Sequence, residues 1–174
     1  MIGLIHLYSG DGKGKTTAAL GLALRFAGHN GKAIIVQLSK GRDTGELHSL
    51  AHIPEIEVLR CSRDYGFWKS MSEAERAACR MENDANLTKA VKAAESGACG
   101  LLIIDEATSA YENGAVDRAV IDKLLSDKPR ELELVLTGRN PTKAMLSAAD
   151  YISEIRSVRH PYERGVDARE GIEF

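Results

Sequence analysis

Residues 9–17 read Ser-Gly-Asp-Gly-Lys-Gly-Lys-Thr-Thr, and they connect an apolar run at 2–8 to a stretch of helical period at 18–26. A glycine-rich turn between a strand and a helix can direct backbone N–H groups at one anion, and the positive N-terminal end of the helix adds to the attraction. Lys15 supplies a mobile charge for phosphate, and Thr16 supplies a hydroxyl for magnesium. The stretch therefore predicts a phosphate-binding loop whose ligand is a nucleoside triphosphate.

The loop is a variant of the common pattern G-x-x-x-x-G-K-[ST], because Ser9 stands at its first position. The dinucleotide-binding fingerprint G-x-G-x-x-G fails on the same residues, since Lys15 stands where the third glycine is required. The fingerprint also requires an acid at the end of the second predicted strand, but Gln37 and Leu38 are found there. The alternative interpretation is a glycine-rich turn with surface lysines. Such a turn would not need the flanking strand and helix, which a phosphate-binding loop requires, so the context favours the phosphate-binding loop.

Apolar runs of strand length alternate along the chain with longer segments of helical period. Strands are predicted at residues 3–8, 33–38, 57–59, 101–104, 132–136 and 151–155. Helices are predicted at residues 16–27, 73–95, 116–125 and 142–148. This alternation predicts an α/β fold of the P-loop NTPase type, with a mostly parallel six-stranded sheet, helices on both faces, and a single domain over residues 1–174. Such sheets bind ligands at the carboxyl ends of their strands.

Several helix ends carry recognisable local signals. Ser72 and Glu75 form the pattern of a capping box at the start of the long third segment. Asn140 before Pro141 predicts an N-cap followed by proline in the first turn. Gly28 and Gly31 are expected to close the first helix.

Composition excludes several classes of partner. A net charge of -2 offers no field for nucleic acid, and no apolar run approaches the roughly 20 residues of a membrane span. The chain enters a strand at once, without a signal sequence, so a cytoplasmic location is expected.

The cysteines Cys61, Cys79 and Cys99 are too few and too scattered for a disulfide framework. His48 and His52 lack a third metal ligand nearby.

Two acids follow a buried strand in residues 101–106, Leu-Leu-Ile-Ile-Asp-Glu. A strand that delivers carboxylates to its carboxyl end is the usual second half of a phosphate-loop site. One of Asp105 and Glu106 would hold magnesium directly or through water, and the other would hold it too or polarise a water. A solvated acidic helix start is the alternative, but the phosphate-binding loop favours metal binding.

Two further groups of side chains follow predicted strands. Arg139 either pairs with phosphate or a substrate carboxylate, or is merely solvated. The loop at 61–71 contains Tyr65, Phe67 and Trp68, which either line a flat apolar ligand or anchor the loop to the core. We find no recognisable arrangement of a protein nucleophile, which indicates that the reacting nucleophile comes with the substrate.

Five stretches together closely resemble the ATP:corrinoid adenosyltransferases of the cobalamin pathway, and the resemblance spans nearly the whole chain. They are residues 10–17, 36–41 (Val-Gln-Leu-Ser-Lys-Gly), 105–106, 135–139 and the tail from 159–162 to 171–174 (Gly-Ile-Glu-Phe). The resemblance implies that a corrinoid reduced to cobalt(I) attacks the C5′ carbon of ATP and expels inorganic triphosphate. It also implies ATP with Mg²⁺, a corrinoid co-substrate, an electron-donating reductant such as a flavoprotein, and a homodimer.

The resemblance assigns roles to individual residues. The catalytic residues it implies are Lys15, Thr16 and Glu106. The residues that would bind ATP or the corrinoid are Gly10, Asp11, Gly12, Lys13, Gly14, Lys15, Thr16, Thr17, Arg139, Phe67 and Trp68. The implied magnesium ligands are Thr16, Asp105 and Glu106. In this family bulky aromatics push away the lower axial ligand of cobalt, and Phe67 and Trp68 match that region.

Two other functions use the same loop and acids. A P-loop NTPase or small-molecule kinase would release ADP with phosphate or with a phosphorylated acceptor, whereas adenosyl transfer releases intact triphosphate. A nucleotide-regulated binding module would bind without turnover. The intact loop lysine and both acids favour an enzyme.

Overall fold

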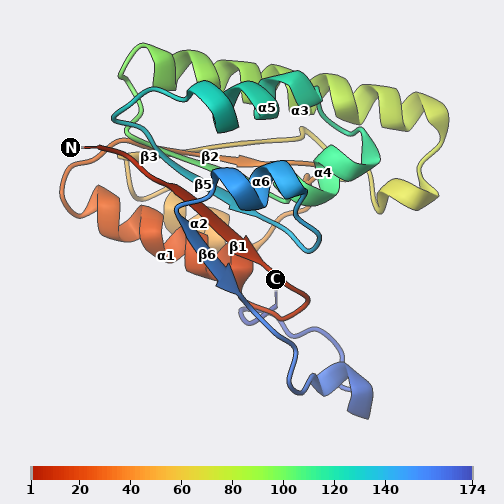
Figure 1. The fold of residues 1–174 in the computed structure, drawn as a ribbon. Helices are drawn as coiled ribbons and strands as arrows, with labels where there is room; N and C mark the ends of the chain where they lie inside the picture. Colours follow the sequence, from red (N-terminus) through yellow and green to blue (C-terminus); the bar gives the residue numbers. More distant parts are fainter. Residues whose placement is uncertain (1, 174) are drawn as a thin grey trace.

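The computed structural model describes residues 2–173, and these form one sheet flanked by helices (Figure 1). The sheet has six strands in the order β3-β2-β4-β5-β1-β6, and every pairing is parallel. The strands are β1 (Ile5–Ser9), β2 (Ala33–Gln37), β3 (Ile56–Arg60), β4 (Leu101–Asp105), β5 (Glu133–Thr137) and β6 (Tyr151–Glu154). The predicted fold class and all six predicted strands are confirmed.

The central strands are apolar because both faces of the sheet are covered. All five residues of β2 and all five of β4 are buried, which is typical of parallel strands between two helical layers. β4 lies between β2 and β5, with Gln37 beside Asp105 and Ile104 beside Leu136. The carboxyl ends of these three strands therefore lie next to one another at one rim of the sheet.

The helices form two layers (Figure 1). They are α1 (Lys15–Ala27), α2 (Gly45–Leu50), α3 (Glu73–Glu95), α4 (Ala107–Asn113), α5 (Arg118–Asp127) and α6 (Lys143–Ala148). α1 and α2 pack on one face through a cluster that includes Ala23 and Leu50. The other four pack on the opposite face through a larger cluster. None of the helices within residues 2–173 is both long and apolar enough to cross a membrane.

The expected helices α1, α3, α5 and α6 are present, and the capping box of Ser72 and Glu75 is confirmed. The prediction that Asn140 caps α6 is wrong, because the hydroxyl of Thr142 accepts the bond from the Met145 N–H at 3.2 Å. Pro141 consequently precedes the cap. Sequence patterns missed α2 and α4, which have only six and seven residues.

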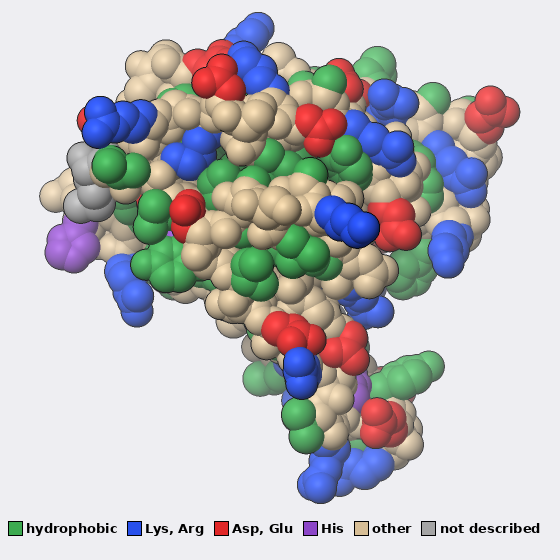
Figure 2. All heavy atoms as spheres, viewed as in Figure 1, with side chains coloured by type: hydrophobic (Ala, Val, Ile, Leu, Met, Phe, Trp, Pro, Cys, Tyr) green, Lys and Arg blue, Asp and Glu red, His purple; other side chains and the backbone are tan. Residues whose placement is uncertain are grey.

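The chain beyond β6 leaves the body of the molecule as a narrow extension (Figures 1 and 2). It turns through a 3₁₀ helix at Pro161–Arg164 and comes back to the loop after β1, so that residues from the two ends of the chain lie together. Figure 2 shows acidic and basic side chains on its surface. The loop after β1 is thus contacted by a part of the chain that is distant in sequence.

Candidate functional site at the carboxyl rim

The predicted phosphate-binding loop lies between the end of β1 and the start of α1. Gly10 and Gly14 have φ angles of 108° and 119°, a backbone region that L side chains rarely adopt. Gly14 is the N-cap of α1 and has no side-chain cap, so the first turn of the helix has no internal partner for its amides there. Ser9, which departs from the common pattern, is the last residue of β1 and is buried beside Glu154. A strand residue at this position does not require glycine.

The extension after β6 packs directly against this loop. The Gly12 N–H donates to the Ile155 carbonyl oxygen at 2.8 Å. A Cβ atom added to Gly12 would lie 2.7 Å from the Arg156 carbonyl carbon, and one added to Gly10 would lie 2.4 Å from the Ile155 oxygen. These two glycines therefore make room for another part of the backbone. The Gly12 amide also differs from the expected orientation, since it is directed at Ile155 and not at the interior of the loop.

Charged side chains of the loop hold the same extension. The Ser157 N–H donates to Asp11 Oδ1 at 3.1 Å. Lys13 Nζ lies 2.7 Å from Glu173 Oε1 and also donates to the Ile172 carbonyl oxygen at 3.1 Å. The pKa of Glu173 is lowered to about 2, first by its bonds with Arg169 and then by the bond from Lys13. The tail is therefore fastened to the loop by ionised groups.

Lys15 lies at the centre of the charged groups of the site. Its Nζ donates to the Gly12 carbonyl oxygen at 2.7 Å, which folds the side chain back over the loop. Burial lowers the pKa of Lys15, nearby Arg139 lowers it further, and the carboxylates Glu106, Asp11 and Asp105 oppose the shift. The structure therefore brings Arg139, which is exposed, and both predicted metal-site acids close enough to act on the loop lysine.

Asp105 ends β4 and is only 1% exposed, yet every side of its carboxylate has a partner. Oδ1 accepts bonds from Thr16 Oγ1 at 2.9 Å and from Thr137 Oγ1 at 2.6 Å. Oδ2 lies 2.6 Å from Lys40 Nζ. These partners come from α1, from the end of β5 and from the segment after β2, and they meet because β4 lies between β2 and β5. A buried carboxylate requires such donors.

Glu106 follows Asp105 and is the N-cap residue of α4. Its φ of 61° places it in the left-handed region, which is uncommon for a residue other than glycine. The Glu106 N–H donates to Thr137 Oγ1 at 3.0 Å, and its Oε2 accepts from Ser109 Oγ at 3.0 Å. Thr137 thus fixes both acids, the first by donating a hydrogen bond and the second by accepting one.

The oxygen donors at this rim suit a magnesium ion. The Thr16 hydroxyl and the Asp105 and Glu106 carboxylates are hard oxygen ligands, which Mg²⁺ prefers. Within residues 2–173 no group of three or more His, Cys, Asp or Glu side chains could form an all-protein cage.

Phe67 and Trp68, two of the three aromatics in the loop at 61–71, differ in burial. Phe67 is 87% exposed. Trp68 is partly buried against Met71 and Cys79, and the Arg76 guanidinium lies 5.8 Å from the centre of its ring. The sequence left two interpretations open for these aromatics. Anchoring of the loop to the core fits Trp68, and contact with a flat apolar ligand fits Phe67.

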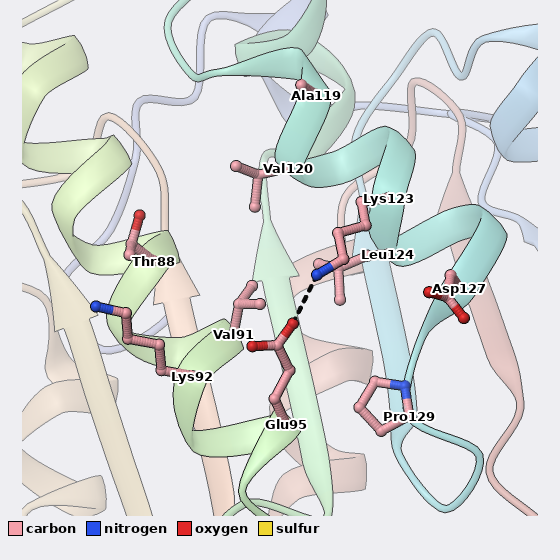
Figure 3. A pocket seen from close by; sticks show the side chains of 10 residues that line it. All are labelled: Thr88, Val91, Lys92, Glu95, Ala119, Val120, Lys123, Leu124, Asp127 and Pro129. Atoms are coloured by element: carbon pink, nitrogen blue, oxygen red, sulfur yellow. Dashed lines mark hydrogen bonds and ion pairs between the residues drawn. The ribbon is translucent and has the colours of Figure 1, made fainter.

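A separate groove lies between α3 and α5 (Figure 3). It has a volume of about 340 Å³, and Val91, Val120 and Leu124 are among its lining residues. Lys123 Nζ and Glu95 Oε1 form an ion pair across it at 2.9 Å. None of the predicted site residues lines this groove, so it is not part of the nucleotide site.

The fold and the rim define a P-loop nucleotide-binding protein. The chain matches the family ATP:corrinoid adenosyltransferase BtuR/CobO/CobP over residues 1–174. It is 34% identical to the corrinoid adenosyltransferase of Escherichia coli (strain K12), covering 99% of this chain and 86% of the relative. It is 32% identical to the corrinoid adenosyltransferase of Pseudomonas aeruginosa, covering 99% of this chain and 84% of the relative. The chain belongs to the ATP:corrinoid adenosyltransferase family, as its motifs indicated.

A comparison with solved structures agrees at the level of the fold. EssC (ATPases 2 and 3) from Geobacillus thermodenitrificans superposes with a TM-score of 0.53 and 12% identity. The match covers 98% of this chain and 36% of that one. At this identity the likeness supports the α/β fold of an ATPase and nothing about substrates.

Sequence reasoning did not assign roles to Lys40, Thr137 or the carbonyl of Ile155. Lys40 and Thr137 both belong to stretches that carried the family resemblance, and both follow predicted strands. A polar residue just beyond a buried strand was the available signal. Their shared contact with Asp105 depends on the strand order, which no local pattern contains.

Proposed function

We propose that this protein transfers the 5′-deoxyadenosyl group of ATP to the cobalt(I) of a reduced corrinoid, in adenosylcobalamin biosynthesis or salvage. Membership of the adenosyltransferase family supports this function. The observation that carries it is the 2.9 Å hydrogen bond from Thr16 to Asp105, which unites the phosphate-binding loop and the acidic strand end in one site. The NTPase or kinase alternative is not favoured, because the named relatives are adenosyltransferases.

The reaction needs positioning and charge neutralisation more than a protein nucleophile. Cobalt(I) supplies the electron pair for the new cobalt–carbon bond to C5′. The C5′–O bond breaks, and triphosphate leaves with that bond's electrons. The protein must therefore hold the sugar carbon toward the corrin and stabilise a polyanionic leaving group.

The loop at 10–17 holds the triphosphate in this proposal. The N-terminal end of α1 attracts anions, and Lys15 and nearby Arg139 add positive charge. Lys15 Nζ moves from the Gly12 carbonyl oxygen to a phosphate oxygen when ATP binds. Asp11 and Lys13 position the loop through the C-terminal extension. Thr17, exposed beside Thr16, is a further phosphate contact.

Thr16, Asp105 and Glu106 hold Mg²⁺ in this proposal, and the bound ion would neutralise charge on the departing triphosphate. The Thr16 hydroxyl keeps its bond to Asp105 and offers a lone pair on the opposite side. Asp105 is oriented by Thr137, and Glu106 is oriented by Ser109.

Phe67 contacts the corrin in this proposal, and Trp68 anchors the loop that carries it. An aromatic side chain that is 87% exposed on an anchored loop can occupy the lower face of a corrin without first leaving the core. The loop is fastened to α3, because Tyr65 donates to Glu82 at 2.6 Å. An occupied lower face keeps the axial ligand away from cobalt.

We also propose a homodimer, a cytoplasmic location and an external reductant such as a flavoprotein. The edge strand β6 supports the dimer, since all four of its residues are exposed and Tyr151 and Ile152 are each more than half exposed. The extension adds Val158 at 93% and Tyr162 at 75%. A partner subunit that pairs with this edge would cover these exposed apolar side chains.

The experiment is an anaerobic assay with magnesium-ATP and chemically reduced corrinoid. A light-sensitive alkylcobalt product together with one equivalent of triphosphate is expected. ADP with phosphate, and no alkylcobalt product, would instead indicate phosphoryl transfer. ATP binding without any product would indicate a binding module.

A further inference from the structure

Lys40 has a place in the site that neither the motifs nor the family match explains. We propose that Lys40 is a mobile cation of this site: it neutralises Asp105 while no metal is bound, and it is released onto the triphosphate once a divalent ion occupies its place. The second half of this inference rests on the proposed function, which supplies the triphosphate. The first half concerns the protein and the metal alone.

Lys40 contacts two of the oxygen ligands proposed for the metal. Its Nζ lies 2.6 Å from Asp105 Oδ2 and 3.5 Å from Thr16 Oγ1. A lysine ammonium and a divalent cation that contacted the same two oxygens would lie close together and repel each other. Both cations therefore cannot use these oxygens at once. Binding of the metal therefore requires the Lys40 amine to move.

Asp105 explains why a cation is needed here before any metal arrives. Its side chain is 1% exposed, and an unpaired buried carboxylate is strongly unfavourable. The hydroxyls of Thr16 and Thr137 satisfy Oδ1 but carry no net charge. Lys40 forms the only ion pair that Asp105 makes among residues 2–173.

The backbone around Lys40 is fixed, whereas its side chain can turn. Asn83 holds the preceding residue on two sides, accepting from the Ser39 N–H at 2.9 Å and donating to Ser39 Oγ at 3.1 Å. The Lys40 carbonyl oxygen accepts from the Cys61 N–H at 3.0 Å. The side chain itself is 32% exposed, and its flexible stem ends in a compact charge that suits phosphate. Lys40 can therefore re-aim its amine without a change of the main chain.

The released amine would serve the leaving group. Lys15 and Lys40 both interact with Asp105, one through space and one by direct contact, so both amines lie at the same rim. A second lysine directed at the triphosphate would stabilise the negative charge that grows as the C5′–O bond breaks. Lys40 is thus a positioning residue for the carboxylate before binding and a contact of the substrate afterwards.

The test compares Lys40→Met with Lys123→Met, which removes an exposed ion pair on α5. Mn²⁺ binding is measured by electron paramagnetic resonance, without nucleotide or corrinoid. Lys40→Met is expected to bind Mn²⁺ about tenfold more tightly than wild type, the factor that corresponds to one charge-assisted hydrogen bond. Lys123→Met should bind Mn²⁺ as wild type does. Unchanged or weaker Mn²⁺ binding by Lys40→Met would overturn the proposal.

Two further measurements separate this role from a structural one. Lys40→Arg keeps the charge and should bind Mn²⁺ within about threefold of wild type, a factor well below that of one charge-assisted hydrogen bond. If it bound as tightly as Lys40→Met is expected to, charge would not be the cause. With Mn²⁺ at saturation, Lys40→Met should bind inorganic triphosphate about tenfold more weakly, again the factor of one charged contact. Equal triphosphate binding would reject the second half alone. Because no corrinoid is present, failure of adenosyl transfer would leave these results intact.

Discussion

Gly12→Ala tests whether the C-terminal extension is part of the phosphate-binding loop. The new Cβ would lie 2.7 Å from the Arg156 carbonyl carbon and 2.8 Å from the Ile155 carbonyl oxygen. Both are backbone atoms that cannot turn aside, so the extension must separate from the loop. Overpacking of this kind costs about 1–3 kcal/mol, and loss of the bond from Gly12 to Ile155 would add about 1 kcal/mol. We expect a loss of about 2–4 kcal/mol in the free energy of unfolding by urea.

Gly21→Ala is the matched control, because nothing lies within 4 Å of a Cβ atom at this exposed position of α1. Alanine should stabilise the helix there by up to about 1 kcal/mol. Limited proteolysis provides a second readout, since separation from the loop should make residues 155–173 more sensitive in Gly12→Ala than in Gly21→Ala. ATP affinity should fall in Gly12→Ala and not in Gly21→Ala. Equal stability and equal protease resistance of the two variants would refute the reasoning.

Three further outcomes are expected. Lys15→Ala should abolish triphosphate release from ATP and reduced corrinoid while circular dichroism remains that of the native fold, and undiminished release would count against the loop assignment. Phe67→Ala should impair cobalt(II) reduction more than reaction with pre-reduced cobalt(I), without loss of stability. Trp68→Ala should also destabilise the protein in thermal unfolding. Equal activity losses with cobalt(II) and with pre-reduced cobalt(I) would reject the axial-ligand role. The folded pKa of Glu173, about 2, lies below its ordinary value of 4.5, so its contribution to stability is full above 4.5 and is lost as pH falls through about 2. The contact with Lys13 should therefore persist from pH 7 to pH 4 in protease-protection measurements, and detachment of the tail within that range would contradict it.

The sequence predicted those parts of the structure that depend on local patterns. The buried runs of β2 and β4 and the glycine-rich loop are contiguous, so their periodicity and spacing suffice to recognise them. The short helix α4 was missed because its N-cap, Glu106, has a left-handed conformation that no sequence pattern indicates. Its seven residues also carry too few turns for a periodic signal.

The candidate site was predicted as a set of motifs but not as a network. Lys40, Thr16 and Thr137 meet at Asp105 only because β4 is placed between β2 and β5. The contact of Gly12 with Ile155 likewise requires β6 to lie beside β1. These contacts join residues more than 30 positions apart and depend on the order of the strands. Their prediction therefore requires the tertiary structure.

The most direct test of the central claim is a crystal structure of the protein with magnesium-ATP and a corrinoid bound. The account predicts that residues 10–17 enclose the triphosphate and that the C5′ carbon of the ribose faces the cobalt. A complex with the terminal phosphate directed at the corrin, or with the adenosine buried far from it, would contradict the account.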